Sequence, residues 1–203
     1  LNIHLGDGAR HLDLIERVVH ETEIPVTQFL PTHINRNSHL FEASVSFARE
    51  GGYVDFTGNE DMDSWEKISD EVRVCTGIRR LLDAGVSENN FTISSDGQGS
   101  LPRFSPSGQY EGLGIGKASS LLKEIRECVL REHLPLELAL RAVTANPARI
   151  LKLNTKGHIA PGYDGDICLL HKDSLQLHTV IAKGKIMVQD GTAKVRGTFE
   201  SSL

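Results

Sequence analysis

The chain of 203 residues has little cysteine and no long apolar stretch. Its three cysteines, Cys75, Cys128 and Cys168, are widely spaced and form no CxxC pair. The sequence therefore predicts neither a disulfide framework nor a zinc finger with thiolate ligands. Unpaired cysteines favour a reducing cytoplasm. No apolar run approaches the ~20 residues that span a bilayer, and no charged-then-apolar leader opens the chain, so we expect no membrane partner.

The chain also lacks a basic run, and its formal net charge is −5. This charge gives no electrostatic reason to expect nucleic acid or an anionic membrane as a partner. Hydrophobic residues make up 39% and charged residues 24%, which is typical of a folded globular protein and not of a disordered one. A small molecule is therefore the expected partner.

Apolar periodicity predicts alternating strands and helices along the first two thirds of the chain. Apolar residues at Leu12, Ile15, Val18 and Val19 recur at helical spacing and predict an amphipathic helix over 8–23. The same reasoning predicts the end of a strand over 1–4, strands over 27–33, 53–57 and 91–96, and helices over 40–49, 64–84, 117–132 and 135–145. Such alternation with short connections predicts a parallel sheet, open or closed into a barrel.

Four strands are half of an eight-stranded barrel. The segment 97–116 is rich in Gly, Ser and Pro and is interpreted as a long functional loop, and the acidic segment 58–63 as a surface turn. From Gly157 onward, short β segments over 166–171, 179–182 and 185–189 predict a separate small β domain. We assign residues 1–153 to the barrel and 154–203 to the β domain.

Candidate metal ligands stand at the ends of predicted strands. His4, His33 and Asp96 end the first, second and fourth strands, and the carboxyl ends of parallel strands meet at one edge of the sheet. A histidine taken alone is more often a surface residue or a hydrogen-bonded core residue, and the other histidines are interpreted in that way. These three gain weight because they share one kind of position and belong to residue types that bind zinc.

Two further features accompany these ligands. Arg36 lies three residues past His33 and could grip a substrate anion with two hydrogen bonds, although a solvated arginine is the ordinary interpretation. Asp96 begins a glycine-rich turn that lets backbone approach a ligand. A carboxylate beside a metal can bind it and also accept a proton, although Asp-Gly is a common turn as well.

Three sequence blocks resemble the metallo-type isoaspartyl (β-aspartyl) dipeptidases. They are His4 followed by Leu-Gly-Asp-Gly, the block Leu-Pro-Thr-His-Ile-Asn-Arg-Asn over 30–37, and Ser-Ser-Asp-Gly-Gln-Gly-Ser over 94–100. The segments 144–148, 156–166 and 182–185 resemble the exit from barrel to β domain across the amidohydrolase superfamily. The resemblance implies an α/β fold: the C-terminal half of a (β/α)8 TIM barrel of amidohydrolase type, followed by part of a small β-sandwich domain.

The resemblance also implies a role for each candidate residue. His4 and His33 would bind one Zn2+ of a two-zinc centre, and Asp96 would bind the other and act as general base. Arg36 and Ser100 would hold the α-carboxylate of the substrate. The implied reaction is hydrolysis of isoaspartyl dipeptides, and the implied complete enzyme is a large homo-oligomer.

The chain departs from the family pattern in two places. The His-x-His pair of the first barrel strand and the carbamylated lysine that bridges the two zinc ions have no counterpart in it. The chain is therefore expected to begin in the middle of a fold, to bind zinc weakly and to be inactive alone.

Two alternative functions are kept open. The first is a cyclic-amide amidohydrolase of the dihydroorotase or hydantoinase kind, which the pairing of Arg36 with Ser100 disfavours because that pair suits a free α-carboxylate. The second is a non-catalytic amidohydrolase-like assembly protein. Such proteins typically lose metal ligands, whereas His4, His33 and Asp96 are all present here.

Overall fold

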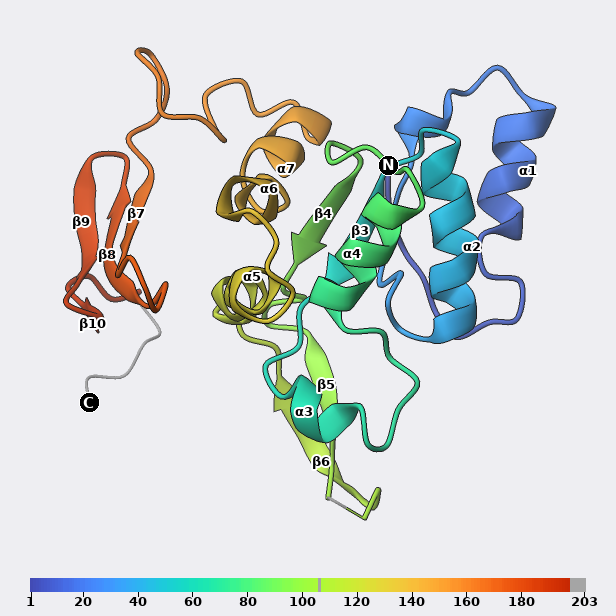
Figure 1. Ribbon diagram of the computed structural model, residues 1–203, viewed down its shortest axis with the longest axis horizontal. Helices are drawn as coiled ribbons and strands as arrows, with labels where there is room; N and C mark the ends of the chain where they lie inside the picture. Colours follow the sequence, from blue (N-terminus) through green and yellow to red (C-terminus); the bar gives the residue numbers. More distant parts are fainter. Residues whose placement is uncertain (106, 198–203) are drawn as a thin grey trace. The chain divides into compact units, whose positions relative to one another are not determined.

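A parallel sheet of four strands, in the order β1-β2-β3-β4, forms the centre of the first part of the chain (Figure 1). The strands are β1 (Asn2–His4), β2 (Leu30–Thr32), β3 (Val54–Thr57) and β4 (Phe91–Ser94). Each strand pairs in parallel with the next along the chain, because a helical connection returns the chain to the same end of the sheet. The parallel sheet predicted from the alternation of segments is thus confirmed.

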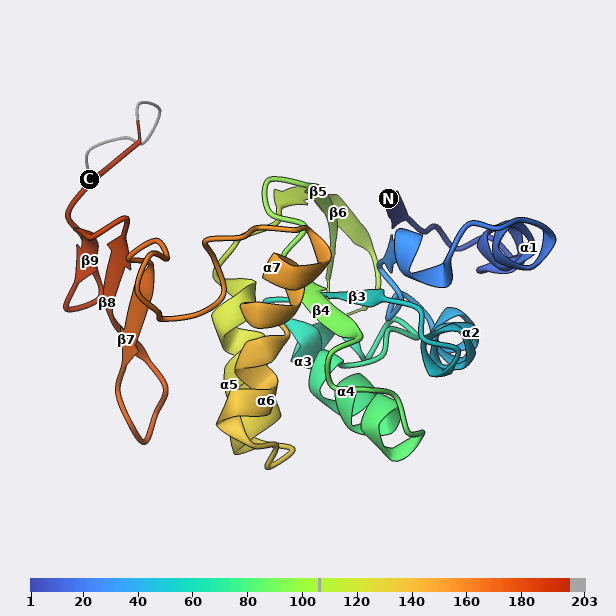
Figure 2. The same ribbon diagram turned by 90° about the horizontal axis from the view of Figure 1, so that it is seen from above.

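Helices cover one side of this sheet. Figures 1 and 2 show α2 (Ser38–Arg49), α4 (Val74–Asp83) and α5 (Ser120–Leu130) along that side. The same part of the chain also contains α1 (Asp13–Glu21), the short 3-10 helix η1 (Val26–Gln28) and α6 (Leu136–Arg141). The core between helices and sheet is apolar and buried, and its largest members are Phe41, Phe47, Phe56 and Phe91. Burying each such side chain contributes about 1.5–3 kcal/mol, which holds the layers together as a partial (β/α)8 barrel.

The structure, a computed structural model, describes residues 1–105 and 107–197. The chain divides into two compact units, Leu1–Asn146 and Pro147–Leu203, whereas the boundary predicted from sequence lies between 153 and 154. Helix α7 (Ala145–Ile150) spans the division. The second unit contains an antiparallel sheet in the order β10-β9-β8-β7, built from β7 (Ile167–Leu170), β8 (Leu177–Ala182), β9 (Lys185–Gln189) and β10 (Thr192–Ala193).

The single helix predicted over 64–84 is wrong. A short helix, α3 (Met62–Trp65), is followed by an irregular segment, and α4 begins only at Val74. Contacts with Asn35 explain the break, because the backbone N–H of Val72 donates to the Asn35 carbonyl (2.8 Å) and the Asn35 amide donates to the Val72 carbonyl (3.3 Å). Backbone groups engaged by another part of the fold cannot also form helical hydrogen bonds.

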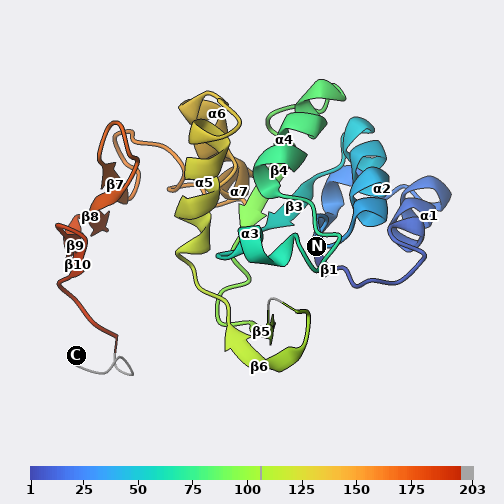
Figure 3. The same ribbon diagram turned by 60° about the horizontal axis from the view of Figure 1, so that its bottom comes forward.

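The segment 97–116, predicted to be a long functional loop, includes two paired strands. It contains the antiparallel hairpin of β5 (Ser100–Phe104) and β6 (Tyr110–Ile115), which Figure 3 shows close to α3. The Phe104 ring lies 5.5 Å from the Trp65 ring of α3 and 5.9 Å from the Tyr110 ring, measured between centroids. These aromatic contacts join two connections that follow different strands of the parallel sheet.

Cys75, Cys128 and Cys168 are free thiols. Cys75 and Cys128 are buried, Cys168 is exposed, and burial raises the pKa of the Cys75 thiol to about 11. In the part of the chain that the structure describes, no helix is both long enough and apolar enough to cross a bilayer.

Candidate metal centre

The three predicted metal ligands meet at the carboxyl edge of the parallel sheet. His4 is the last residue of β1, His33 follows β2 directly, and Asp96 lies two residues beyond β4. One nitrogen of each histidine and one Asp96 carboxylate oxygen all lie within 4.8 Å of one another. The shared direction of the strands brings these residues together, although they are separated by up to 92 positions in sequence, from 4 to 96.

The donor atoms fit a divalent metal ion. His4 Nδ1 lies 2.9 Å from His33 Nε2, and two nitrogen ligands of one tetrahedral zinc lie about 3.3 Å apart. Two imidazoles and a carboxylate suit zinc and are also accepted by cobalt, manganese or nickel. Within residues 1–105 and 107–197, no other group of three or more His, Cys, Asp or Glu side chains is arranged to hold a metal.

Two of the three candidate ligands have an unusual backbone conformation. The φ angle is 66° at His33 and 45° at Asp96, in the left-handed region that costs non-glycine residues about 1–2 kcal/mol. Two glycines allow the turn at Asp96, because a Cβ at Gly99 or Gly116 would lie 2.8 or 2.5 Å from the Asp96 carbonyl oxygen. Such conformations persist where surrounding contacts over-determine them, and they cluster at functional sites.

His33 is the most enclosed of the three candidate ligands. The residue is only 6% exposed. Its Nδ1 lies 2.6 Å from the hydroxyl oxygen of Thr57, the last residue of β3. Burial lowers the pKa of His33, and the nearby Arg36 guanidinium lowers it further. A low pKa favours the neutral ring, which is the form that binds metals.

A cavity of about 440 Å³ opens beside these ligands. Its lining residues are Asp7, His33, Asn35, Arg36, Thr57, Gly58, Asn59, Trp65, Ser69, Glu71, Asp96, Ser100, Leu101 and Pro102. Arg36 and Ser100, the two residues predicted to bind a substrate carboxylate, therefore face the same space as two of the metal-ligand candidates. Arg36 is 41% exposed, and its Nη1 lies 3.8 Å from Asp7 Oδ2, so its guanidinium is available to an anionic ligand.

Sequence reasoning missed the residues that brace this site from behind. Asn35 is 1% exposed, and its side chain bonds both the N–H (2.8 Å) and the carbonyl (3.0 Å) of Thr57. Its amide also donates to Glu71 (3.2 Å), a carboxyl group whose pKa burial raises to about 7. No local pattern marks Asn35 or Glu71, since their partners lie 22 to 37 residues away.

A buried carboxyl group lies under the ligand-bearing strand ends. Asp55 on β3 accepts hydrogen bonds from the Thr92 hydroxyl (2.5 Å), the Ser94 hydroxyl (2.6 Å) and the Thr32 hydroxyl. Burial raises the pKa of Asp55, against the opposing effect of these donors. Asp55 therefore ties β2 and β4 to β3 just before each strand reaches His33 or Asp96.

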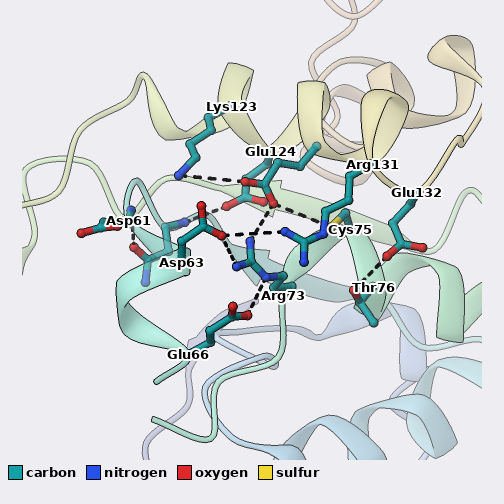
Figure 4. Close-up of polar contacts among 12 residues, drawn as sticks. Asp61, Asp63, Glu66, Arg73, Cys75, Thr76, Lys123, Glu124, Arg131 and Glu132 are labelled. Atoms are coloured by element: carbon teal, nitrogen blue, oxygen red, sulfur yellow. Dashed lines mark hydrogen bonds and ion pairs between the residues drawn. The ribbon is translucent and has the colours of Figure 1, made fainter. Parts of the chain in front are cut away.

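Figure 4 shows an ion-pair cluster around Arg73. Two of its members, Asp63 and Glu66, flank in sequence Trp65, which lines the cavity. Arg73, 6% exposed, pairs through Nε with Glu66 (2.7 Å) and through Nη1 with Glu127 of α5 (3.1 Å), and it also contacts Asp63 of α3. The hydrogen bond to Glu66 is the largest cause that raises the pKa of Arg73. The cluster holds the α3 segment against α5.

Comparison with known proteins assigns the family. Residues 69–187, more than half of the chain, match the model of the Amidohydrolase family. The chain belongs to the amidohydrolase family. It is 37% identical to the beta-aspartyl dipeptidase of the thermophilic, keratin-degrading Fervidobacterium islandicum AW-1 in complex with a beta-Asp-Leu dipeptide, with a TM-score of 0.82 over 98% of this chain and 50% of that one. A second crystal structure of that enzyme gives 34% identity and a TM-score of 0.80.

This amidohydrolase chain spans about half the length of the dipeptidase that it matches. An adenosine deaminase from Xanthomonas campestris with bound zinc is 16% identical, with a TM-score of 0.52 over 97% of this chain and 47% of that one, which shows a shared fold alone. The resemblance to isoaspartyl dipeptidases stated from the motifs is thus confirmed, as is the partial amidohydrolase barrel.

Proposed function

We propose that this chain forms part of the active site of a zinc-dependent hydrolase of isoaspartyl (β-aspartyl) dipeptides. The observation that carries the proposal is the gathering of donor atoms from His4, His33 and Asp96 within 4.8 Å, beside a cavity that Arg36 and Ser100 also line. The 37% identity to a dipeptidase in complex with beta-Asp-Leu supports this choice of substrate.

In this proposal, His4 and His33 hold one zinc ion of a two-zinc centre, and Asp96 holds the other. Bound zinc would polarise the scissile carbonyl and lower the pKa of the attacking water. The Asp96 carboxylate oxygen that is not engaged with metal would accept the proton released by that water and return it to the leaving amine. Asp96 is thus both a ligand and the general base.

Substrate recognition follows from the chemistry of the isoaspartyl residue. Its peptide bond uses the β-carboxyl group, so its α-carboxylate stays free and ionised. Arg36 would bind that carboxylate through two N–H groups, and the Ser100 hydroxyl would donate a further hydrogen bond. Anchoring this end would fix the amide near the candidate metal ligands. It would thereby lower the entropic part of the activation free energy of hydrolysis.

We also propose that the 203-residue polypeptide binds zinc weakly and is inactive alone. Each catalytic zinc usually takes three protein ligands, whereas the described residues gather only three candidate ligands in all, which in this proposal would be shared between two ions. Strands β1 and β4 each pair on one side only within the described sheet. The bridging lysine, the remaining ligands, the cytoplasmic setting and the homo-oligomeric state of a complete enzyme are parts of the same proposal.

The test measures hydrolysis of β-aspartyl-leucine with added zinc. It compares the chain alone with the chain fused to the half of the Fervidobacterium islandicum enzyme that it does not match. We expect only the fusion to cleave, with His33→Ala and Asp96→Ala abolishing cleavage and His20→Ala, at an exposed site on α1, preserving it.

Three results would count against the proposal. Cleavage by the chain alone at the rate of the fusion would refute the incompleteness. A fusion that cleaves dihydroorotate or hydantoins and leaves β-aspartyl-leucine intact would move the substrate to cyclic amides. A folded fusion that binds zinc and cleaves neither class of substrate would support a non-catalytic assembly role.

A further inference from the structure

We infer that Thr57 is a positioning residue that selects the ring tautomer of His33 and so directs the His33 Nε2 lone pair at the metal centre. The inference rests on the proposed metal centre. Its geometric basis is the pair of contacts at opposite ends of one ring: Nδ1 lies 2.6 Å from the Thr57 hydroxyl oxygen, and Nε2 lies 2.9 Å from His4 Nδ1.

The chemistry of imidazole makes the first contact decisive for the second. A neutral ring carries one N–H and one lone pair, and only the nitrogen with the lone pair can bind a metal. If Thr57 accepts a hydrogen bond from Nδ1–H, Nε2 keeps its lone pair toward His4. If Thr57 donated to Nδ1, the proton would lie on Nε2 and block the metal. A hydrogen bond at the distal nitrogen is the usual means of fixing a ligating histidine.

The Thr57 hydroxyl can act in this way because its own position is fixed. The Asn35 side chain accepts from the Thr57 N–H (2.8 Å) and donates to the Thr57 carbonyl (3.0 Å), so one buried amide clamps the backbone of the residue. A β-branched side chain has few χ1 rotamers, which limits where its oxygen can lie. Asn35 lies two residues after His33, so the turn that carries the ligand also carries the clamp.

The ring of His33 needs such an anchor. The χ2 torsion of histidine is broad, and rotation by half a turn exchanges nitrogen and carbon positions around the ring. His33 also has a left-handed backbone, φ 66°, that its own sequence does not favour. Strand β3, which ends at Thr57, supplies no metal ligand and lies between the two strands that lead to His33 and Asp96, where it can brace the site.

The test uses the metal-free 203-residue chain labelled with ¹⁵N, at a pH where His33 is neutral. Long-range ¹H–¹⁵N spectra locate the proton on the His33 ring, with His33→Gln for assignment. We expect the proton on Nδ1 in the unsubstituted chain and in Thr57→Ser. In Thr57→Val, which replaces the hydroxyl by a methyl group, we expect a larger fraction of rings with the proton on Nε2. Zinc affinity of the fusion described above, measured by equilibrium dialysis, should fall about 10–100-fold in Thr57→Val and little in Thr57→Ser.

Either of two results would overturn the inference: a proton on Nε2 in the unsubstituted chain, or an unchanged tautomer and zinc affinity in Thr57→Val. If Thr57→Val does not fold, as judged from its backbone amide spectrum, the tautomers of the unsubstituted chain and of Thr57→Ser still decide the matter. If no variant of the fusion binds zinc, the proposed metal centre fails, and the tautomer spectra of the 203-residue chain report on Thr57 independently.

Discussion

The Ser94 hydroxyl on β4 donates a 2.6 Å hydrogen bond to the Asp55 carboxyl group on the neighbouring strand β3. The same carboxyl group accepts from Thr92 and from Thr32, which are 3% and 2% exposed. Asp55→Val would leave these hydroxyls without their acceptor in the interior. We expect a loss of about 2–5 kcal/mol in the free energy of unfolding, since each unsatisfied buried polar group costs about 1–3 kcal/mol.

Urea-induced unfolding checks this prediction. Asp55→Asn is the matched control, because its amide oxygen still accepts hydrogen bonds and its volume is nearly unchanged, and it should lose less than half as much stability. Equal stability of Asp55→Val and the unsubstituted chain would mean that the hydroxyls find other partners.

Arg73 should be far more sensitive to substitution than its neighbour Arg131. Replacing Arg73 by Met removes three ion pairs at once and leaves the largely buried Glu127 without its closest cation. We expect a loss of about 3–5 kcal/mol, the usual effect of breaking a buried ion pair by removing one partner. Arg131→Met breaks a 3.8 Å pair with exposed Asp63 and should change the unfolding free energy little. Thermal denaturation of both variants tests this difference. Similar melting temperatures for Arg73→Met and Arg131→Met would contradict the prediction that the Arg73 ion pairs act as buried ones.

Glu124 predicts a pH dependence of stability. It is 3% exposed, accepts from the Asn59 N–H (2.9 Å), and burial raises its pKa from 4.5 to about 7. The folded chain therefore binds a proton that the unfolded chain releases between these values. The contribution of Glu124 is complete below pH 4.5 and is lost as the pH rises through about 7, a change of at most about 3 kcal/mol.

Denaturant unfolding across this pH range compares the chain with Glu124→Gln, whose side-chain amide oxygen can still accept from the Asn59 N–H. The stability of the unsubstituted chain relative to Glu124→Gln should fall as the pH rises. A constant difference would show that Glu124 titrates normally in the folded state.

Gly77 in α4 should resist a substitution that normally favours helices. An alanine Cβ there would lie 2.5 Å from the Phe56 ring and 3.2 Å from the Phe41 ring, both fully buried. Helix propensity favours Ala over Gly by about 1 kcal/mol, but overpacking of a dense core costs about 1–3 kcal/mol, so we expect net destabilisation. Gly8→Ala, with no neighbour within 4 Å of the added Cβ, is the control in the same unfolding assay. Stabilisation by Gly77→Ala would show that the Phe56 ring moves aside at little cost.

The sequence by itself determined the alternation of strands and helices and the residues that end the strands. Apolar spacing is a local property, set by the 3.6-residue period of a helix and the burial of each strand, and it can be recognised within windows of about 11–18 residues. Because parallel strands direct their carboxyl ends to one edge, His4, His33 and Asp96 could be selected without coordinates, and the structure brings their donor atoms within 4.8 Å.

Only the tertiary structure decided which groups support those ligands. The Thr57 contact with His33, the Asn35 clamp and the Asp55 hydrogen bonds join residues 22 to 39 positions apart, and no local period specifies them. The same reason explains the wrong helix over 64–84, where the Val72 backbone pairs with Asn35 instead of continuing a helix. Buried polar groups must find partners wherever the packed fold supplies them, so these contacts depend on the whole fold and not on local sequence.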